Sequence, residues 1–188
     1  MAPREEVIAI ETSLCAVTLV LGGAASGKSV FAEGLIAAGF GLRWDHATYL
    51  ATATAGDGEM TDKIRRHRAR RGAQWITVEE PLDLAGAMMR HDDPARPVLV
   101  DCLTLWLSNA LLAGRDMDDQ TVLLAAALKD MTGPVVLVAN EVGLSIVPDN
   151  ALARAFRESA GRLNQAIAAI ANRVYFVAAG LPITLKDR

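Results

Sequence analysis

The chain has 188 residues, a length that suits one α/β domain with a substantial buried core. Hydrophobic residues make up 52% of the sequence, which excludes an intrinsically disordered chain. The 19 basic and 22 acidic residues give a net charge of −3, which excludes binding of nucleic acid through bulk positive charge.

Residues 1–16 precede the first predicted strand, and we expect them to be an extension to which the sequence assigns no function. They lack the apolar core of a signal peptide, and no apolar run reaches the roughly 18 uncharged residues of a membrane span. Cys15 and Cys102 lack metal-site spacing, and we expect both to be buried, inert thiols. These features predict a cytoplasmic protein in a reducing compartment.

The first predicted strand leads into a glycine-rich turn. Residues 17–21 (VTLVL) form a short apolar run that is typical of a buried strand. Residues 22–29 (GGAASGKS) fit the pattern G-x-x-x-x-G-K-S, and residues 29–38 (SVFAEGLIAA) are predicted to form a helix. Strand, turn and helix in this order favour a phosphate-binding loop over a chance glycine-rich turn.

Strands and helices alternate through the middle of the chain. A loop is expected at 54–58, a polar turn at 91–97 and a strongly apolar segment at 103–112. Glycine and proline positions help to set the boundaries of the elements between them. We predict strands at 47–53, 75–78 and 97–101, and helices at 59–71 and 82–90.

The same alternation continues to the C-terminus, with a helix at 121–131, a strand at 134–139, a long helix at 151–171 and a last strand at 174–179. Several of the strands are apolar on both faces. This pattern is typical of a parallel sheet covered by helices on both sides. No linker or repeat is evident, so we predict one domain over residues 17–188.

The glycine-rich turn has the chemistry of a nucleotide site. Its backbone N–H groups can converge on phosphate oxygens, and the following helix directs its positive end at them. Lys28 is expected to bridge the β- and γ-phosphates as a catalytic residue, and the Ser29 hydroxyl to hold Mg²⁺. The expected phosphate contacts are Gly22, Gly23, Ala24, Ala25, Ser26, Gly27, Lys28 and Ser29.

Asp101 ends an apolar predicted strand downstream of this turn. Ligands of parallel α/β sheets gather beyond the carboxyl ends of the strands, where such an acid commonly holds Mg²⁺. The alternative is an ordinary helix N-cap ahead of Leu103. The upstream loop favours the metal role.

The predicted helix at 59–71 contains His67 among six basic residues of positions 63–71. Met60, Ile64 and His67 share one face, so the imidazole is expected to point toward the protein body. Surrounding cations disfavour its charged form, and a neutral imidazole near a nucleotide phosphorus can act as a nucleophile. A solvated basic face with a core histidine explains the residue types equally well. His46 and His91 are predicted surface residues.

Three acids near predicted strand ends have open roles. Glu79 and Glu80 could accept hydrogen bonds from a ribose or a guanine edge, or could be solvent-facing charges before Pro81. Glu141 could be a base, a residue that positions water, or a helix-cap partner.

These motifs together resemble one family over about residues 18–186. The sequence resembles the bifunctional adenosylcobinamide kinase / adenosylcobinamide-phosphate guanylyltransferase of cobalamin biosynthesis. Many unrelated enzymes share the phosphate loop, whereas the HR helix and the NEVG…IVP segment are far more specific. The segments that carry the resemblance are LVLGGAASGKS, YLATA at 49–53, EM…KI…HR at 59–68, W…T…E at 75–79, VLVDCLT at 98–104, VVLVANEVGLSIVP at 135–148 and FRESAGRLNQ at 156–165.

The resemblance implies a RecA-like P-loop NTPase fold, with a mostly parallel sheet, and two reactions. A nucleoside triphosphate, ATP or GTP, phosphorylates a hydroxyl of adenosylcobinamide. GMP then passes from GTP to that phosphate through a guanylyl-histidine intermediate, which gives adenosylcobinamide-GDP and pyrophosphate. His67 occupies the position of the nucleophile. The further nucleotide-binding positions that the resemblance implies are Thr52, Ala53, Thr54, Arg68, Ala69, Arg70, Arg71, Glu79 and Asp101.

The resemblance also implies a homotrimer with nucleotide sites near subunit contacts, to which segments 103–112 and 151–171 could contribute. One departure is Ala25, where the family commonly has arginine, so a phosphate-binding cation is missing here. Two other functions fit the phosphate loop: a kinase for another small alcohol, and a nucleotide-dependent switch or assembly protein of the RecA type. Neither gives His67 a covalent role.

Overall fold

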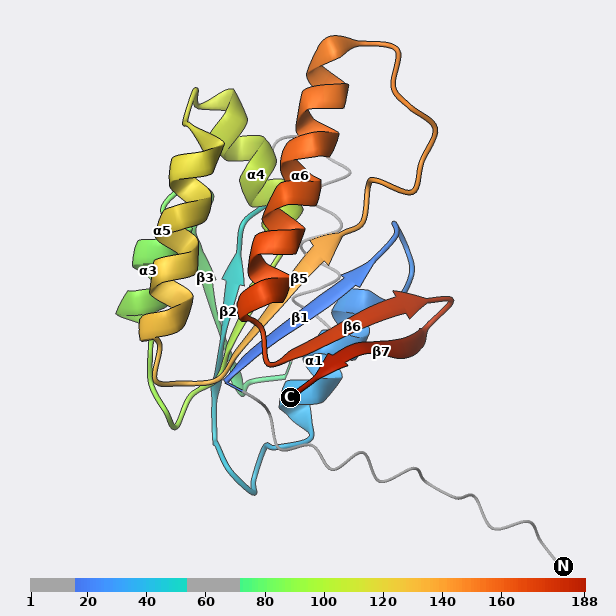
Figure 1. Ribbon diagram of the computed structural model, residues 1–188. Coiled ribbons are helices and arrows are strands. Elements are labelled where there is room, and N and C mark those ends of the chain that lie inside the picture. Colours follow the sequence, from blue (N-terminus) through green and yellow to red (C-terminus); the bar gives the residue numbers. More distant parts are fainter. Residues whose placement is uncertain (1–15, 54–71) are drawn as a thin grey trace, which may run out of the picture.

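The computed structural model describes residues 16–53 and 72–188. Within them, one seven-stranded sheet has the strand order β3-β2-β4-β5-β1-β6-β7 (Figure 1). Six strands run parallel, and β7 runs antiparallel to β6. The strands are β1 (Val17–Gly22), β2 (Ala47–Ala51), β3 (Trp75–Glu79), β4 (Val98–Asp101), β5 (Val135–Asn140), β6 (Arg173–Ala178) and β7 (Leu181–Asp187).

Helices cover both faces of this sheet, with α1 on one face and the other described helices on the opposite face (Figure 1). The N-termini of α3, α5 and α6 are capped by the side chains of Asp83, Asp116 and Asn150. Each of these side chains accepts a hydrogen bond from at least one backbone N–H group of the first helical turn. The described helices are α1 (Lys28–Ala37), α3 (Leu84–Arg90), α4 (Leu103–Leu112), α5 (Met117–Asp130) and α6 (Ala151–Ile170).

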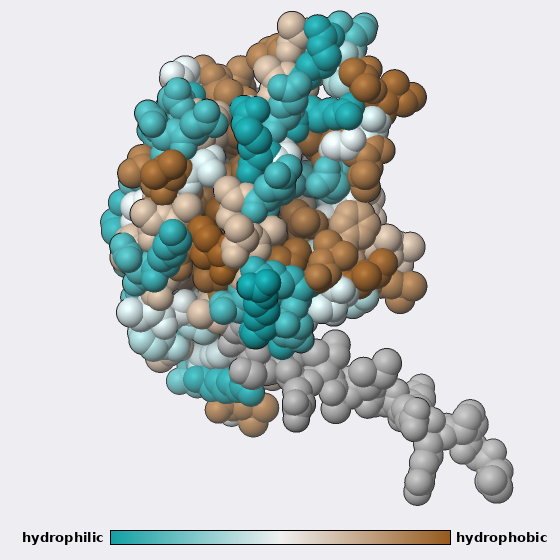
Figure 2. Space-filling view, in the orientation of Figure 1, coloured by the Kyte–Doolittle hydropathy of each residue, from teal (hydrophilic) through white to brown (hydrophobic). Residues whose placement is uncertain are grey.

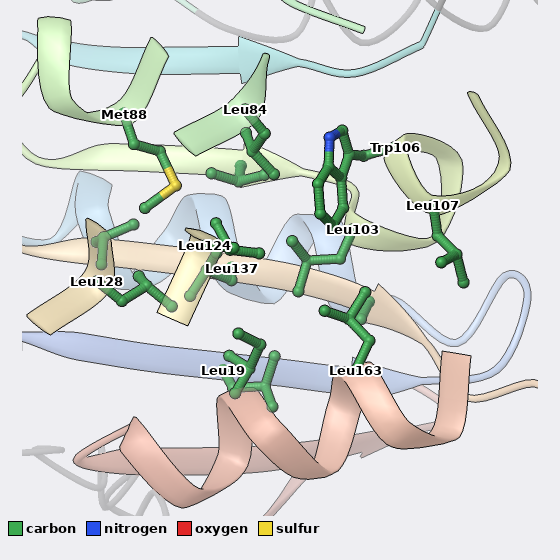
Figure 3. Packing of buried hydrophobic residues seen from close by; sticks show 14 of the residues in the cluster. Leu19, Leu84, Met88, Leu103, Trp106, Leu107, Leu124, Leu128, Leu137 and Leu163 are labelled. Carbon is green, nitrogen blue, oxygen red and sulfur yellow. The ribbon is translucent and has the colours of Figure 1, made fainter. Parts of the chain in front are cut away.

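The central strands bury both of their faces. Leu19 belongs to the core under α3 to α6, and Val20, the next residue, belongs to the core under α1. Figure 3 shows the larger core, in which Leu19 and Leu137 from the sheet lie among leucines of the helices. Burial of each such side chain contributes about 1.5–3 kcal/mol. This explains why strands β1 and β5 are uniformly apolar rather than alternating.

The predicted order of elements is confirmed for the described residues as far as β6, with differences at several boundaries. The helix predicted at 121–131 begins four residues earlier, at Met117, because Asp116 provides its cap. The helix predicted at 82–90 begins at Leu84, after the Asp83 cap, rather than near Pro81. The strand predicted at 47–53 ends at Ala51. The loop predicted at 54–58 and the helix predicted at 59–71 lie outside the described residues.

Two predictions about individual segments were wrong or incomplete. The last strand was expected at 174–179, yet β7 follows it as an antiparallel edge strand. The apolar segment 103–112 is helix α4, whose Leu103, Trp106 and Leu107 are fully buried in the chain's own core. Leu112 at its end is exposed, and a contribution of this segment to subunit contact stays a prediction.

Exposed apolar residues concentrate in two places. Leu144 and Ile146, in the loop between β5 and α6, are 81% and 92% exposed. Leu181 and Ile183 of β7 are also exposed. Figure 2 shows both apolar areas on the side of the molecule that carries β6 and β7. No helix in the described ranges is both long enough and apolar enough to span a membrane.

Candidate active site

The glycine-rich turn connects the carboxyl end of β1 to α1, in the order that the sequence predicts. The amide of Ser26 donates to the Gly23 carbonyl at 3.3 Å, and the amide of Phe31 donates to the Gly27 carbonyl at 3.0 Å. Ala25 and Gly27 have left-handed φ values of 55° and 94°. Alternation of right- and left-handed residues turns backbone N–H groups toward a common point, which is the geometry of an anion site.

Lys28 and the start of α1 add positive potential to this turn. The Lys28 side chain is buried, and its Nζ donates to the Gly23 carbonyl at 3.1 Å, so it folds back over the turn. Gly27 is the N-cap of α1, and no side chain of residues 16–53 or 72–188 caps this end. The N–H groups of the first helical turn therefore remain available to a phosphate.

Gly22 is required at the point where β1 enters the turn. A Cβ atom at this position would lie 2.5 Å from the Val177 carbonyl oxygen and 2.5 Å from the Ser26 Oγ. The backbone carbonyl cannot move without breaking the sheet, since Gly22 pairs with Val177 in the β1–β6 ladder. Close packing of β6 against β1 thus explains the first glycine of the motif.

Asp101 lies at the carboxyl end of β4, on the edge of the sheet that carries the glycine-rich turn. The Tyr49 hydroxyl donates to its Oδ2 at 2.7 Å. Ala51 of β2 pairs with Asp101 on one side and with Glu79 of β3 on the other, so the two acids end the strands that flank β2, at the same level. The N-cap of α4 is Cys102, so the alternative of Asp101 as that helix's cap was wrong.

Thr52, a predicted nucleotide contact, is fully buried and joins β2 to the start of α4. Its Oγ1 donates to the Cys102 carbonyl at 2.7 Å and accepts from the Cys102 amide at 2.9 Å. Its own carbonyl accepts from Asn109 Nδ2 at 2.8 Å. These bonds give the Thr52 side chain a structural role, while Ala53 follows it partly exposed at the same edge.

Sequence reasoning missed Thr104 and Asn109, two of the three polar residues of the apolar segment 103–112. Thr104 Oγ1 accepts from the Asn140 amide at 2.7 Å, which links α4 to the end of β5. Asn109 Nδ2 donates to the carbonyls of Thr52 and Pro81. Polar residues in a mostly apolar helix are a signal for such contacts, because a buried polar group requires a partner.

The structure gives different surroundings to Glu79, Glu80 and Glu141, the three acids with open roles. Glu80 Oε1 accepts from the amides of Leu82 and Asp83, and its Oε2 lies 3.5 Å from Arg90, so Glu80 stabilises the entry to α3. Glu79 is exposed at the end of β3. Glu141 follows β5; its amide donates to the Gly22 carbonyl at 3.0 Å and its Oε1 accepts from Gly143.

Cys102 is a buried thiol, as predicted, and it is the N-cap residue of α4. Burial and, next, the negative charge of Asp101 raise the pKa of the Cys102 thiol to about 11. Such a thiol is protonated at neutral pH and is a poor nucleophile. Among the described residues, no group of three or more His, Cys, Asp or Glu is arranged to hold a metal ion.

The remaining predicted site residues lie outside the described residues. They are the nucleophile candidate His67 and Thr54, Arg68, Ala69, Arg70 and Arg71. Of the other histidines, His46 is exposed and His91 is partly exposed at the end of α3.

Comparison with known proteins shows the family of this chain. Residues 18–185 match the family model described as "Cobinamide kinase / cobinamide phosphate guanyltransferase". The chain belongs to this family. It is 49% identical to a bifunctional adenosylcobalamin biosynthesis protein of Pseudomonas aeruginosa over 170 residues, which cover 89% of this chain and 96% of the relative. A Salmonella typhimurium protein of the same description is 38% identical over 183 residues, covering 89% of this chain and 98% of that protein.

The likeness to solved structures concerns the fold alone. The flagellar accessory protein FlaH of Methanocaldococcus jannaschii superposes with a TM-score of 0.52 at 12% identity, covering 92% of this chain and 79% of FlaH. The predicted α/β fold, a mostly parallel sheet with helices on both faces, is thereby confirmed. The family membership identifies the chain as an enzyme with kinase and guanylyltransferase relatives.

Proposed function

We propose that this chain phosphorylates adenosylcobinamide with a nucleoside triphosphate and then transfers GMP from GTP to the new phosphate, which releases pyrophosphate and gives adenosylcobinamide-GDP. Family membership over residues 18–185 is the observation that carries this proposal. The glycine-rich turn supports it, because both reactions need a triphosphate held at a fixed place.

In this proposal the turn of residues 22–29 binds the triphosphate through its N–H groups, and Lys28 contacts the phosphate oxygens. Ser29 and Asp101 would hold Mg²⁺, which neutralises charge on the phosphates when it is bound. Their hydroxyl and carboxylate oxygens are the hard donors that this ion prefers, and a site with only two protein ligands suits an ion that binds largely through phosphate and water. Tyr49 engages Oδ2 of Asp101, and a carboxylate has further lone pairs to offer a cation.

For guanylyl transfer we propose His67 as the nucleophile. Its imidazole nitrogen forms a bond to the α-phosphorus of GTP while the bond from that phosphorus to pyrophosphate breaks. A phosphate oxygen of the corrinoid then attacks the same phosphorus, and the phosphorus–nitrogen bond breaks. Two in-line displacements replace one difficult step, and the cationic residues 68, 70 and 71 next to His67 suit the charge that develops on the phosphates.

Labelled GTP tests the covalent step. Label in the α-phosphate should remain on the denatured protein and be released by acid, whereas label in the γ-phosphate should not remain. His67→Ala should abolish labelling, while His46→Ala and His91→Ala, the matched controls, should retain it. Retention of the α-label by His67→Ala would contradict the assignment.

A product assay tests the two reactions separately. With adenosylcobinamide and either ATP or GTP, the wild-type chain should form the phosphate, and only with GTP should it form the GDP product. Lys28→Ala should lower the rate of phosphate formation by at least about a hundredfold, because it removes a charge that stabilises the transferring phosphoryl group. A phosphate product from another alcohol, with none from the corrinoid, would favour the simpler kinase.

We also propose that residues 17–188 act as one catalytic domain and that the enzyme is a homotrimer. The exposed apolar side chains of Leu144, Ile146, Leu181 and Ile183 support a subunit contact on that side of the molecule. Sedimentation equilibrium should give the mass of three chains. A monomer mass at micromolar concentration would contradict the trimer.

A further inference from the structure

We propose that Gly180, in the turn between β6 and β7, is a positioning residue for the phosphate-binding turn. Its N–H holds the Ser26 carbonyl and thereby directs the Gly27 N–H toward the side where the phosphates bind. The inference rests on the proposed nucleotide site at residues 22–29. It gives a role to the turn that leads into β7, the edge strand that the sequence analysis did not predict.

The turn between β6 and β7 has a fixed geometry. Its two central residues, Ala179 and Gly180, have left-handed φ values of 51° and 79°. The flanking pair Ala178 and Leu181 closes the hairpin. Two consecutive left-handed residues are typical of a type I′ turn, whose twist matches that of the paired strands. Because β6 also pairs with β1, the turn is held rigidly beside the end of β1.

This turn packs directly against the phosphate-binding turn. The Gly180 amide donates to the Ser26 carbonyl at 2.8 Å. A Cβ atom on Gly27 would lie 3.1 Å from the Gly180 Cα, and one on Gly22 would lie 2.5 Å from the Val177 carbonyl oxygen. Two glycines of the motif therefore allow the close approach of β6 and its turn, in addition to any approach of a phosphate.

The hydrogen bond from Gly180 fixes the orientation of one peptide unit. The peptide between Ser26 and Gly27 is trans, so its carbonyl and its N–H point in opposite directions. With the carbonyl held by the Gly180 amide, the Gly27 N–H points away from the hairpin. Gly27 is the N-cap of α1, so this N–H lies at the positive end of the helix, where an anion is stabilised. Release of the carbonyl would let the peptide unit rotate and withdraw one donor.

Two substitutions at Gly180 separate the backbone geometry from the added side chain. Gly180→Val disfavours the left-handed conformation strongly, whereas Gly180→Asn tolerates it. A Cβ at position 180 would meet no atom of the described part of the chain within 4 Å, so neither change creates a clash at Cβ there. Nucleotide affinity should therefore follow the backbone preference of the new residue rather than its size.

Gly41 offers a matched control. It has a φ of 73°, its amide donates to the Trp44 carbonyl at 3.1 Å, and a Cβ there would also meet nothing within 4 Å. It follows the far end of α1, about 15 Å of helix away from the phosphate-binding turn. Gly41→Val thus imposes the same strain away from the proposed site.

The test measures the Kd of Mg²⁺-ATP, Mg²⁺-GTP and Mg²⁺-tripolyphosphate by titration calorimetry, together with the Tm of each variant. Gly180→Val should raise all three Kd values by about tenfold or more, which is the scale of one hydrogen bond to a charged group. Gly180→Asn should stay near wild type, and Gly41→Val should lower the Tm with unchanged Kd values.

An unchanged Kd in Gly180→Val, or an equal rise in Gly41→Val, would overturn the inference. Should Gly180→Val fail to fold, Gly180→Ala against Gly41→Ala gives the same comparison with less strain. Absence of nucleotide binding by the wild-type chain would overturn the proposed function as well, which distinguishes the two failures.

Discussion

Polar side chains at the ends of β2 and β4 hold the carboxyl edge of the sheet together. Tyr49 donates to Asp101, and Thr52 exchanges two hydrogen bonds with the backbone of Cys102. These residues lie next to a tightly packed apolar core, where an unpaired polar group would be costly. The position of Asp101, and with it the proposed Mg²⁺ site, therefore depends on hydrogen bonds made by Tyr49 and Thr52.

The Tyr49 hydroxyl tests this dependence. Tyr49→Phe should lower the free energy of unfolding by about 1–2 kcal/mol, because it removes a hydrogen bond to a charged group. It should also raise the Mg²⁺ concentration needed for half-maximal nucleotide binding. Tyr175→Phe, at the other tyrosine of the same core, is the control and should leave the Mg²⁺ dependence unchanged. If nucleotide binding by Tyr49→Phe needed the same Mg²⁺ concentration as the wild type, Tyr49 would have no role at the metal site.

The Cys102 thiol gives a prediction about alkaline pH. Its folded-state pKa of about 11 exceeds the ordinary 9.0, so its contribution to stability is complete below pH 9 and is lost as pH rises through 11. Cys102→Ala should therefore make the free energy of unfolding less dependent on pH across that range. In a Cys15→Ser background, Cys102 should resist iodoacetamide near neutral pH until the chain is unfolded. Rapid modification of the folded protein would contradict the burial.

Among the secondary-structure elements, α3 and β5 are joined through a single carboxylate. Asp92, just after α3, accepts from the amides of Thr132 and Gly133 and from the Thr132 hydroxyl. Burial alone would raise the pKa of Asp92, but these hydrogen bonds outweigh it and lower the pKa below its usual value. The turn after α3 is thereby fixed to the residues that lead into β5.

We expect Asp92→Ala to lower the free energy of unfolding by about 1.5–3 kcal/mol at neutral pH, since hydrogen bonds to a charged group are lost. A folded-state pKa below the unfolded one means that this contribution is present above the usual pKa near 3.8 and disappears as pH falls through the lowered value. The difference between variant and wild type should therefore shrink in acid. Asp93→Ala, which alters only a local bond to Ala95, is the control.

At the scale of the whole molecule, β7 completes the sheet and connects it to helix α6. Its Lys186 Nζ donates to the carbonyls of Ala168 and Ala169, at 2.8 and 3.0 Å, at the C-terminal end of α6. A cation at this position satisfies carbonyls that the helix leaves unpaired and interacts favourably with the helix dipole. The edge strand thus contacts α6 through Lys186 and β6 through the ladder, while Gly180 in the turn before it contacts the phosphate-binding turn.

Lys186→Met preserves the apolar stem but removes the charge and the two hydrogen bonds. It should lower the free energy of unfolding in urea by about 1–2 kcal/mol. Lys129→Met is the control, because Lys129 lies exposed in the last turn of α5 and should cost no more than about 0.5 kcal/mol. Equal losses in the two variants would show that the contact between β7 and α6 adds nothing.

The sheet order and β7 were beyond sequence reasoning. Parallel pairing of β1 with both β5 and β6 joins segments more than 100 residues apart, and no local pattern encodes such partners. Leu181, Ile183 and Leu185 of β7 alternate with other residues, as in a strand, but they follow a turn of Ala179 and Gly180 that lacks the usual asparagine or aspartate signal. Helix starts moved where Asp83 and Asp116, rather than a proline or an apolar residue, made the cap.

The amino-acid sequence by itself determined the alternating α/β pattern, the phosphate-binding turn and the family, because these depend on periodicity and on residue types at short, fixed spacings. Only the tertiary structure decided which residues support that turn. Gly180, Val177 and Tyr49 reach Ser26, Gly22 and Asp101 across the sheet, and each contact arises from strand register. Distant segments meet because apolar faces exclude water together, and that burial is a property of the folded chain as a whole.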